Sequence, residues 1–220
     1  METINHRDER KRRRLEENRM FILQAAENIF SRWGYSMATM DAIAAEAQFS
    51  KATLYRYFKS KREMFLAIIF DSYDDVHEQI EGISLRPLTA EDKLREYIRF
   101  IMSYYKRKEN LIHIFFIEKQ SLKKIFNIDL DSFPLKTVGH PQIPPVLKTK
   151  MESIVKIQET IIREGVDKGE FRQLDVKDAA FVLGAMIRGF HFHGPIQERA
   201  YSLEESCEII LDYFLIGVRK

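Results

Sequence analysis

Residues 34–65 read GYSMATMDAIAAEAQFSKATLYRYFKSKREMF, and aromatic and basic side chains crowd the second half of this stretch. Three kinds of element share such a composition: a helix lying on a membrane surface, a core helix with a charged rim, and a helix that reads nucleic acid. The residues on both sides decide between them.

Two short helices are predicted within residues 40–58. Thr39 can cap the first and Ser50 the second, because a side-chain oxygen there accepts a backbone N–H bond that the first helical turn leaves unpaired. Apolar side chains at helical spacing, among them Leu54 and Phe58, then face a common core. Helix, tight turn and helix in this order make a helix-turn-helix, whose second helix enters the major groove of DNA.

The outward face of the second helix carries the candidate base contacts. Because its apolar side chains turn to the core, four others point outward: Lys51, Ala52, Tyr55 and Arg56. Tyr57 and Lys61 flank this face, where a phenol and an ammonium group can donate to phosphate oxygens. The unpaired N–H groups of the helices that begin after Thr39 and Ser60 add two sites for anions.

The chain outside this stretch is predicted to be helical as well. Apolar residues recur at three- and four-residue spacing and strand-like alternation is nearly absent, so we expect an all-α protein of about nine helices. Three helices make an N-terminal DNA-binding domain at residues 17–66, with the helix-turn-helix at about 40–59. Residues 1–16 precede it as a basic arm, and residues 67–220 form a larger C-terminal helical bundle.

Several helix boundaries can be predicted from single residues. The first helix has an apolar stripe of four residues: Ile22, Ala26, Ile29 and Trp33. Gly34 suits the position just past its end. Ser60 with Glu63, and Ser202 with Glu205, have the spacing of capping boxes, in which a hydroxyl and a carboxylate each accept a backbone N–H bond.

Charge is distributed unevenly along the chain. Residues 1–62 hold 13 basic and 8 acidic side chains, whereas the remaining residues hold 22 basic and 25 acidic ones. Such asymmetry is expected when one end of a protein meets a polyanion and the other end does not.

Composition favours a cytoplasmic protein without a membrane segment. A single cysteine, Cys207, excludes an intramolecular disulfide and fits a reducing compartment. No uncharged apolar run approaches the roughly 18 residues of a membrane-spanning helix. The first residues also lack the apolar block of a secretory signal.

At these residues the sequence resembles the DNA-binding domain of the TetR/AcrR transcriptional regulators, over roughly residues 17–66. The positions that fall on the family pattern are Gly34-Tyr35, Thr39, Ile43-Ala44, Ser50-Lys51, Leu54-Tyr55, Tyr57-Phe58 and Ser60-Lys61. The resemblance implies a chain of nine or ten helices, a homodimer formed through the last two helices, and a ligand cavity in the C-terminal domain.

The same resemblance implies a function and a set of DNA contacts. We expect a sequence-specific transcriptional repressor that a small hydrophobic or aromatic ligand releases from a near-palindromic operator on double-stranded DNA. Carried over to this chain, the base contacts are Lys51, Ala52, Thr53 and Arg56. The phosphate contacts are Thr39, Ser50, Tyr55, Tyr57 and Lys61.

Two positions depart from the family pattern, which commonly has glycine at both. Gln48 stands in the turn, where we expect a left-handed backbone conformation that costs a side-chain-bearing residue roughly 1 kcal/mol or more. Ala52 adds a methyl group where the recognition helix approaches the bases. That methyl group could select for the methyl group of thymine.

The basic arm before the first helix has two interpretations. Its candidate DNA contacts are Arg10, Lys11, Arg12, Arg13 and Arg14. In one interpretation the arm is a solvated, partly helical tail in which arginines pair with Glu16 and Glu17. In the other, it reaches phosphates or a narrow minor groove.

The C-terminal bundle is rich in aromatic and apolar side chains. Most of these are expected to be core, but some are candidates for lining a pocket: Phe100, Tyr104, His113, Phe116, Met151, Phe181 and Arg188. Candidates for a two-fold dimer interface on the last two helices are Ala180, Gly184, Ile210, Leu211 and Phe214. Packing within the chain is the alternative for this second set.

The residues that other functions would require are few in this sequence. His191 and His193 lie two residues apart on a helix and point to different faces, so we expect no metal site. We expect Cys207 to be a small, buried, apolar side chain. With no nucleophile motif or paired catalytic carboxylates, we expect neither a cofactor nor enzymatic activity. Two alternatives remain: a DNA-bound adaptor whose C-terminal domain binds a partner protein, and an all-α enzyme.

Overall fold

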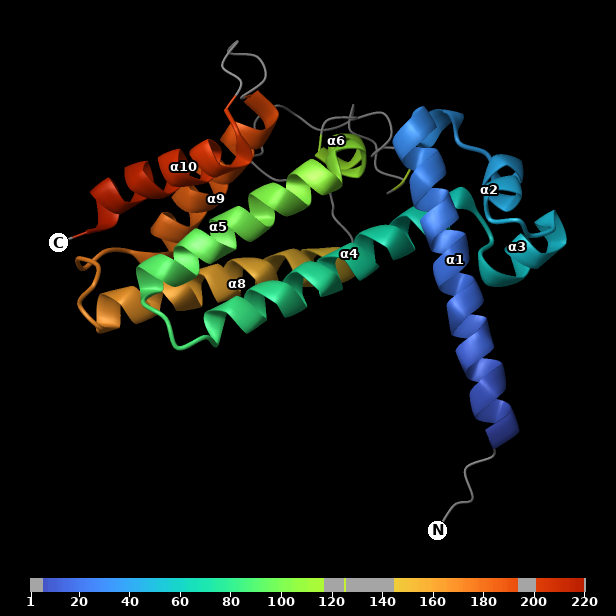
Figure 1. The fold of residues 1–220 in the computed structure, drawn as a ribbon, viewed down its shortest axis with the longest axis horizontal. Coiled ribbons are helices and arrows are strands. Elements are labelled where there is room, and N and C mark those ends of the chain that lie inside the picture. The colour runs from blue at the N-terminus through green and yellow to red at the C-terminus, as the bar shows by residue number, and fades with distance from the viewer. Residues whose placement is uncertain (1–5, 117–124, 126–144, 194–200, 220) are drawn as a thin grey trace. The chain divides into compact units, whose positions relative to one another are not determined.

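The computed structural model describes residues 6–116, 125, 145–193 and 201–219 (Figure 1). Within these ranges all regular elements are helices, apart from one isolated β-bridge between Phe171 and Arg219, so the prediction of an all-α protein is confirmed. The described helices are α1 (His6–Met37), α2 (Met40–Glu46), α3 (Lys51–Tyr57), α4 (Lys61–Ser84), α5 (Ala90–Arg107), α6 (Glu109–Phe116), α8 (Pro145–Asp167), α9 (Val176–His193) and α10 (Leu203–Val218).

The chain divides into two compact units, and the boundary falls inside α4. The first unit comprises Met1–Asp71 and Asn110–Ile143, and the second comprises Ser72–Glu109 and Pro144–Lys220. The first unit therefore holds α1, α2, α3, the beginning of α4, and α6 after its first residue. The second holds the remainder of α4 together with α5, α8, α9 and α10.

Three aromatic rings lie in the core of the first unit. Phe30, Tyr35 and Phe65 pack with ring centroids 5.3 to 5.7 Å apart. Three of the four predicted stripe residues are also buried: Ile22, Ala26 and Ile29. Trp33 is 49% exposed, so its predicted place in the stripe is wrong. The reason is that helical geometry breaks at Gly34, with φ 72°, and the chain turns Tyr35 into the core instead.

The helix-turn-helix has the predicted form in α2 and α3. The Thr39 hydroxyl accepts the N–H of Ala42 at 3.1 Å, and the Ser50 hydroxyl accepts the N–H of Thr53 at 3.1 Å. Gln48 in the turn has φ 57°, the left-handed conformation that the sequence predicts. Both caps and the strained turn residue therefore lie where local sequence rules place them.

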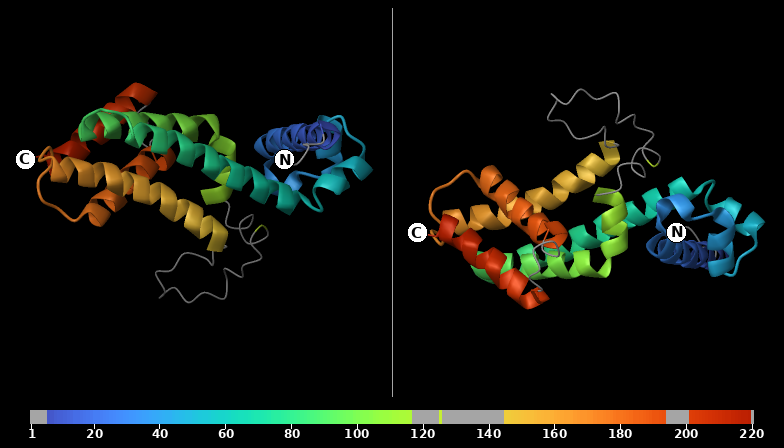
Figure 2. Two further views of the ribbon diagram at one scale, coloured as in Figure 1. Left: turned by 90° about the horizontal axis from the view of Figure 1, so that it is seen from below. Right: turned by 90° about the horizontal axis from the view of Figure 1, so that it is seen from above.

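In the second unit, α5 and α10 pack side by side, as both views of Figure 2 show. The predicted capping box is present at the start of α10, where Ser202 and Glu205 each accept the other's backbone N–H. Cys207 follows one turn later and is buried. Burial raises the pKa of the Cys207 thiol to about 11.

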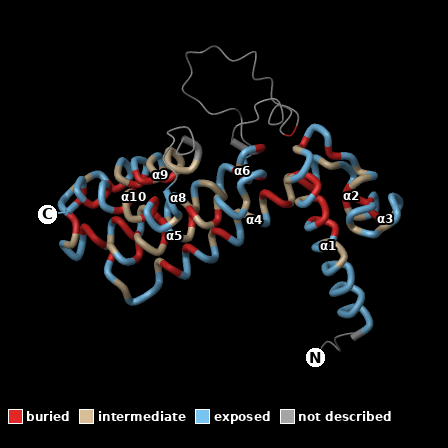
Figure 3. The backbone as a smooth tube through the Cα atoms, turned by 45° about the horizontal axis from the view of Figure 1, so that its top comes forward, coloured by how far each residue is buried: buried red, intermediate tan, exposed pale blue. Residues whose placement is uncertain are grey.

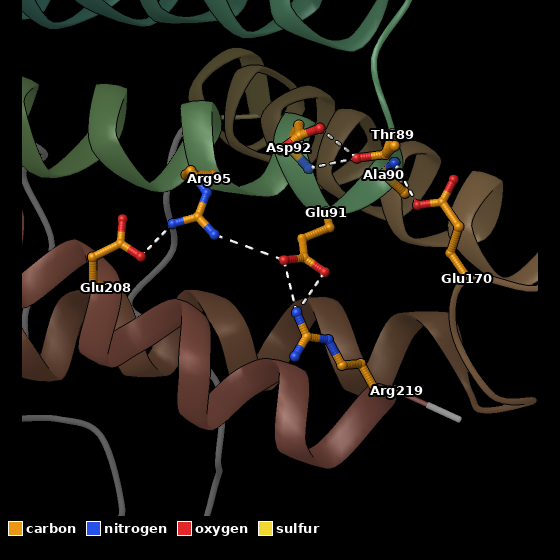
Figure 4. Close-up of polar contacts among 8 residues, drawn as sticks. All are labelled: Thr89, Ala90, Glu91, Asp92, Arg95, Glu170, Glu208 and Arg219. Carbon is orange, nitrogen blue, oxygen red and sulfur yellow. Dashed lines mark hydrogen bonds and ion pairs between the residues drawn. The ribbon is translucent and has the colours of Figure 1, made fainter.

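A chain of ion pairs joins the start of α5 to α10 (Figure 4). One guanidinium nitrogen of Arg219 lies 2.7 Å from both carboxylate oxygens of Glu91. Glu91 also lies 3.7 Å from Arg95, which pairs with Glu208 on α10. Isolated surface pairs contribute little to stability, but linked pairs between two helices favour one register of packing over others.

Candidate nucleic-acid interface

Helix α3 has one buried and one exposed face. Leu54 is fully buried and Phe58 is 3% exposed, so these two side chains hold the helix against its own unit. All four side chains predicted to point outward are exposed: Lys51, Ala52, Tyr55 and Arg56. Two cations, a phenol and a methyl group thus share one face of a short helix that follows a tight turn, which is the arrangement of a helix that reads bases in the major groove.

Thr53 lies at the edge of this face. It is half-buried, and its hydroxyl oxygen is 2.9 Å from the Ser50 hydroxyl that caps the helix. Among the residues expected to touch bases, Thr53 is therefore the least exposed. A contact from its methyl group is still compatible with this position.

Three of the expected phosphate contacts use hydroxyls that already accept a hydrogen bond. Thr39 and Ser50 accept the N–H bonds of their helices, and Tyr57 accepts from the Asn18 side chain at 3.1 Å. A hydroxyl that accepts keeps its own proton, so Thr39 and Tyr57 can still donate to a phosphate oxygen. Ser50 can do so when Thr53 is the donor of the bond between their hydroxyls. Asn18 was not singled out from the sequence, because its partner lies on a different helix.

Lys61 is engaged inside its own unit. Its ammonium group donates to the carbonyl oxygens of Tyr35 at 2.8 Å, Ser36 at 3.0 Å and Ala38 at 2.8 Å, and lies 4.8 Å from the centre of the Tyr35 ring. An ammonium group has three N–H bonds, and this arrangement uses all of them. The carbonyls belong to the end of α1 and the chain after it, so we assign Lys61 a structural role there in place of the expected phosphate contact.

Lys51 has an acidic partner on the first helix of the motif. Its ammonium nitrogen lies 2.6 Å from a carboxylate oxygen of Asp41, and both side chains are exposed. The hydrogen bond to Asp41 and its negative charge raise the pKa of Lys51, which therefore stays charged. The exposed face of α3 thus has a carboxylate beside it, which helical spacing within α3 alone does not predict.

The basic arm is helical from His6 onward and continuous with α1. Figure 3 shows this first part of α1 as exposed. The five candidate arm contacts are all exposed: Arg10, Lys11, Arg12, Arg13 and Arg14. Arg13 pairs with Glu17 at 3.0 Å, as expected for a solvated helical tail. Contact between this arm and DNA remains a prediction.

The expected pocket residues of the second unit lie on several of its helices. Phe100 and Tyr104 are neighbours on α5, with ring centroids 6.2 Å apart, and Tyr104 is buried. Met151 on α8 and Arg188 on α9 are half-buried. These four remain candidates for contact with a ligand.

Three other expected pocket residues are placed differently. Phe181 is 70% exposed on α9, so it does not line an interior pocket. His113 is exposed on α6 and belongs to the first unit. Phe116 ends α6, and its side chain lies outside the described residues.

The residues expected at a dimer interface are mostly core of the second unit. Four of them are buried within the single chain: Ala180, Ile210, Leu211 and Phe214. They match the alternative of intrachain packing, because a periodic pattern identifies buried residues without showing what covers them. Gly184 faces the Arg188 side chain of its own helix. The exposed large apolar residues of α9 and α10 are Phe181, Val182, Tyr213 and Ile216.

The described residues contain neither a group of metal ligands nor a membrane-spanning helix. Within the ranges that the structure describes, no three histidine, cysteine or carboxylate side chains are grouped as metal ligands would be. His193 lies at the end of α9, with its side chain outside the described part. None of the described helices is long and apolar enough to cross a bilayer.

Comparison with known proteins points to the same region. Residues 22–68 match a family model described as bacterial regulatory proteins, tetR family. The chain is 24% identical over 201 residues to the fatty acid metabolism regulator protein of Bacillus subtilis, covering 90% of this chain and 94% of that protein. It is 23% identical over 167 residues to the B. subtilis HTH-type transcriptional regulator YhgD, covering 76% of this chain and 78% of the relative.

A solved structure shows that the whole fold is shared. The transcriptional regulator FadR from B. subtilis, in complex with stearoyl-CoA, superposes with a TM-score of 0.70 and 21% sequence identity. The superposition covers 90% of this chain and 98% of FadR. The likeness therefore extends beyond the helix-turn-helix to the C-terminal helices, where the sequence pattern alone was uninformative.

Proposed function

Since the chain belongs to the tetR family of bacterial regulatory proteins, we propose that it is a homodimeric repressor that leaves its operator when a small molecule binds its second unit. The observation that carries this proposal is the two-faced recognition helix. Lys51, Ala52 and Arg56 of α3 are exposed, while Leu54 beneath them is fully buried.

The exposed apolar side chains of α9 and α10 support the proposed dimer. On α10, Tyr213 and Ile216 are 69% and 78% exposed and lie three residues apart, which puts them on one face. On α9, Phe181 is 70% exposed. We assign these residues to a two-fold contact, in which each copy contributes the same surface. Such a dimer would read half-sites about one helical turn apart, ~34–36 Å, or a multiple of it.

Helix α4 is the proposed link between effector and DNA. It begins with Lys61 in the first unit and continues to Ser84 in the second. An effector that binds one arrangement of the second unit more tightly than the DNA-competent one would shift the population away from DNA binding. The complex of FadR with stearoyl-CoA suggests a hydrophobic effector.

Selection of bound genomic fragments by the purified protein tests the DNA-binding part of this proposal. We expect enrichment of a near-palindromic motif, and genes beside the selected sites would indicate the effector. Repeating the selection with Ala52→Gly tests the proposed thymine contact. The selected motif should then no longer prefer thymine at the position that Ala52 contacts. Random fragments without a common motif would contradict sequence-specific regulation.

The dimer is tested by sedimentation of Ile216→Asp and Phe181→Asp. Each places a charge in the proposed contact and should yield monomers with weak operator binding. Leu85→Asp is a matched control, because Leu85 is 78% exposed and lies outside the proposed interface. If all three variants remain dimeric, the interface is elsewhere.

A further inference from the structure

The end of the recognition helix is held by two successive residues of α1. The Asn18 side-chain amide donates to the Tyr57 hydroxyl at 3.1 Å, and both residues are half-buried. The next residue of each helix makes a second contact, because the guanidinium of Arg19 lies 5.8 Å from the centre of the Phe58 ring. One side of α1, the side of Asn18, therefore lies against the end of α3.

Arg19 also joins this junction to a third helix. Its guanidinium lies 3.3 Å from a carboxylate oxygen of Asp71 on α4. Rotation of α1 about its own axis would thus break contacts with both α3 and α4. The side of α1 that lies beside Tyr57 is fixed by these contacts.

Before this junction, α1 continues as an exposed helix. Residues 7–17 are all exposed, and Figure 1 shows this part of α1 standing clear of α2 and α3. Twelve residues from His6 to Glu17 make about three turns. Side chains of these turns that share the side of Asn18 therefore continue the surface on which Tyr57 lies.

Helical spacing divides the cations of the arm between two sides of α1. Arg14 and Lys11 lie four and seven positions before Asn18, so they share its side at 3.6 residues per turn. We call these three residues the Asn18 face. Arg12 and Arg13 lie six and five positions before Asn18 and point roughly 120° or more away from it.

The Asn18 face contains no acidic residue. Arg7 continues it one turn before Lys11. The acidic side chains of residues 7–17 lie at the flanks of this face or opposite it: Asp8, Glu9, Glu16 and Glu17. One of them, Glu17, pairs with Arg13 at 3.0 Å. A polyanion that approaches from the side of Tyr57 therefore meets cations along α1.

We propose that Arg14 and Lys11 bind the DNA backbone next to the phosphate that Tyr57 contacts, so that the Asn18 face extends the recognition surface. They lie about 6 and 10 Å from Asn18 along the helix axis. A guanidinium and an ammonium group both donate charge-assisted hydrogen bonds to phosphate oxygens. This inference rests on the proposed function and selects, among the cations of the arm, those that meet DNA.

Two double variants of the full chain test the inference, with a duplex recovered by the genomic selection as the probe. Lys11→Gln with Arg14→Gln removes two charges from the Asn18 face. Arg12→Gln with Arg13→Gln is the matched control, because it removes two charges from the other side of the same turns. Glutamine has nearly the helix propensity of lysine and arginine, so neither variant should unwind the arm.

The salt dependence of binding should differ between the two variants. Fluorescence anisotropy from about 50 to 200 mM salt gives the slope of log affinity against log salt. Each lost phosphate contact lowers this slope by about 0.9 unit, so the first variant should lose close to two units and the control much less than one. Equal slopes in the two variants would overturn the inference. If both slopes match that of the unchanged protein, the arm is a solvated tail, and if both fall alike, the arm binds DNA without a preferred side.

The selection itself separates this inference from the proposed function. If the unchanged protein recovers a common motif but the two variants have equal slopes, only the assignment of the Asn18 face is wrong. If the unchanged protein recovers no common motif, the proposed function itself fails.

Discussion

Lys51 of the recognition helix and Asp41 of the preceding helix form an ion pair, with 2.6 Å between ammonium nitrogen and carboxylate oxygen. If Lys51 contacts a base as proposed, this cation is already paired before DNA binds. The pair leaves two of the three N–H bonds of Lys51 for a guanine edge. We expect the carboxylate to repel phosphates on sites that do not fit, which would favour specificity over affinity.

Replacing Asp41 with Asn should therefore increase binding to non-operator DNA. With the carboxylate gone, one negative charge no longer opposes the phosphates, so discrimination between operator and random DNA should fall. The free energy of unfolding should change little, because exposed ion pairs contribute little. Fluorescence anisotropy with operator and random duplexes measures both affinities. Asp212→Asn makes the same change on α10, and equal effects of the two variants would remove any special role for Asp41.

Replacing Lys61 with Met separates a structural role from a phosphate contact. Loss of the ammonium leaves three carbonyls without their donor, so the free energy of unfolding in urea should fall by about 2–3 kcal/mol. Lys59→Met is the control, because Lys59 donates to a single carbonyl, that of Tyr55. If Lys61 instead holds a phosphate, its variant would unfold normally and lose about one unit of salt dependence.

Replacing Gln48 with Gly should stabilise the protein. Relief of the left-handed strain at φ 57° outweighs the added freedom of glycine in the unfolded chain, for a gain of about 0.5–1 kcal/mol. Gln24→Gly makes the same substitution inside α1, where it should destabilise by about 1 kcal/mol. Urea unfolding of both variants measures the contrast, and destabilisation by both would show that the turn is not strained.

Removing residues 1–14 should flatten the salt dependence of DNA binding if the helical arm contacts phosphates. Each lost contact lowers the slope of log affinity against log salt by nearly one unit. Affinities measured from about 50 to 200 mM salt give the slope. An unchanged slope would identify the arm as a solvated tail, in agreement with the pair between Arg13 and Glu17.

His191 should make the protein less stable in mild acid. Burial lowers the pKa of His191 below its ordinary value of 6.5 in the folded state. The unfolded chain therefore takes up the proton first as pH falls below 6.5, and the free energy of unfolding drops in that window. Urea unfolding between pH 7.5 and 5.5 should show a shallower drop in His191→Gln. His77→Gln is the control, and an identical drop in both would assign the effect to other groups.

The first unit could be predicted from sequence largely because its signals are local. The caps at Thr39 and Ser50 each join residues three apart, and the turn at Gln48 depends on a single backbone angle. The outward face of α3 follows from the buried positions of Leu54 and Phe58. Such rules need no knowledge of the rest of the chain.

The sequence could not predict contacts between distant residues. Lys61 reaches carbonyls up to 26 residues away, and no periodicity distinguishes such an ammonium from one that faces DNA. In the second unit, the apolar pattern of Ile210 and Leu211 shows that they are buried without showing whether the same chain or a second copy covers them. Arg188 could be named as a polar candidate, but which side chains of other helices lie beside it depends on the fold.

The buried thiol of Cys207 makes this protein a convenient background for site-directed labelling. The sequence contains one cysteine, and its raised pKa, about 11, keeps the thiol protonated and slow to react at neutral pH. A cysteine introduced at an exposed position such as Asp212 would then take a spin label selectively. In a two-fold dimer each copy carries one label, and a single electron–electron distance reports the arrangement of the pair in solution.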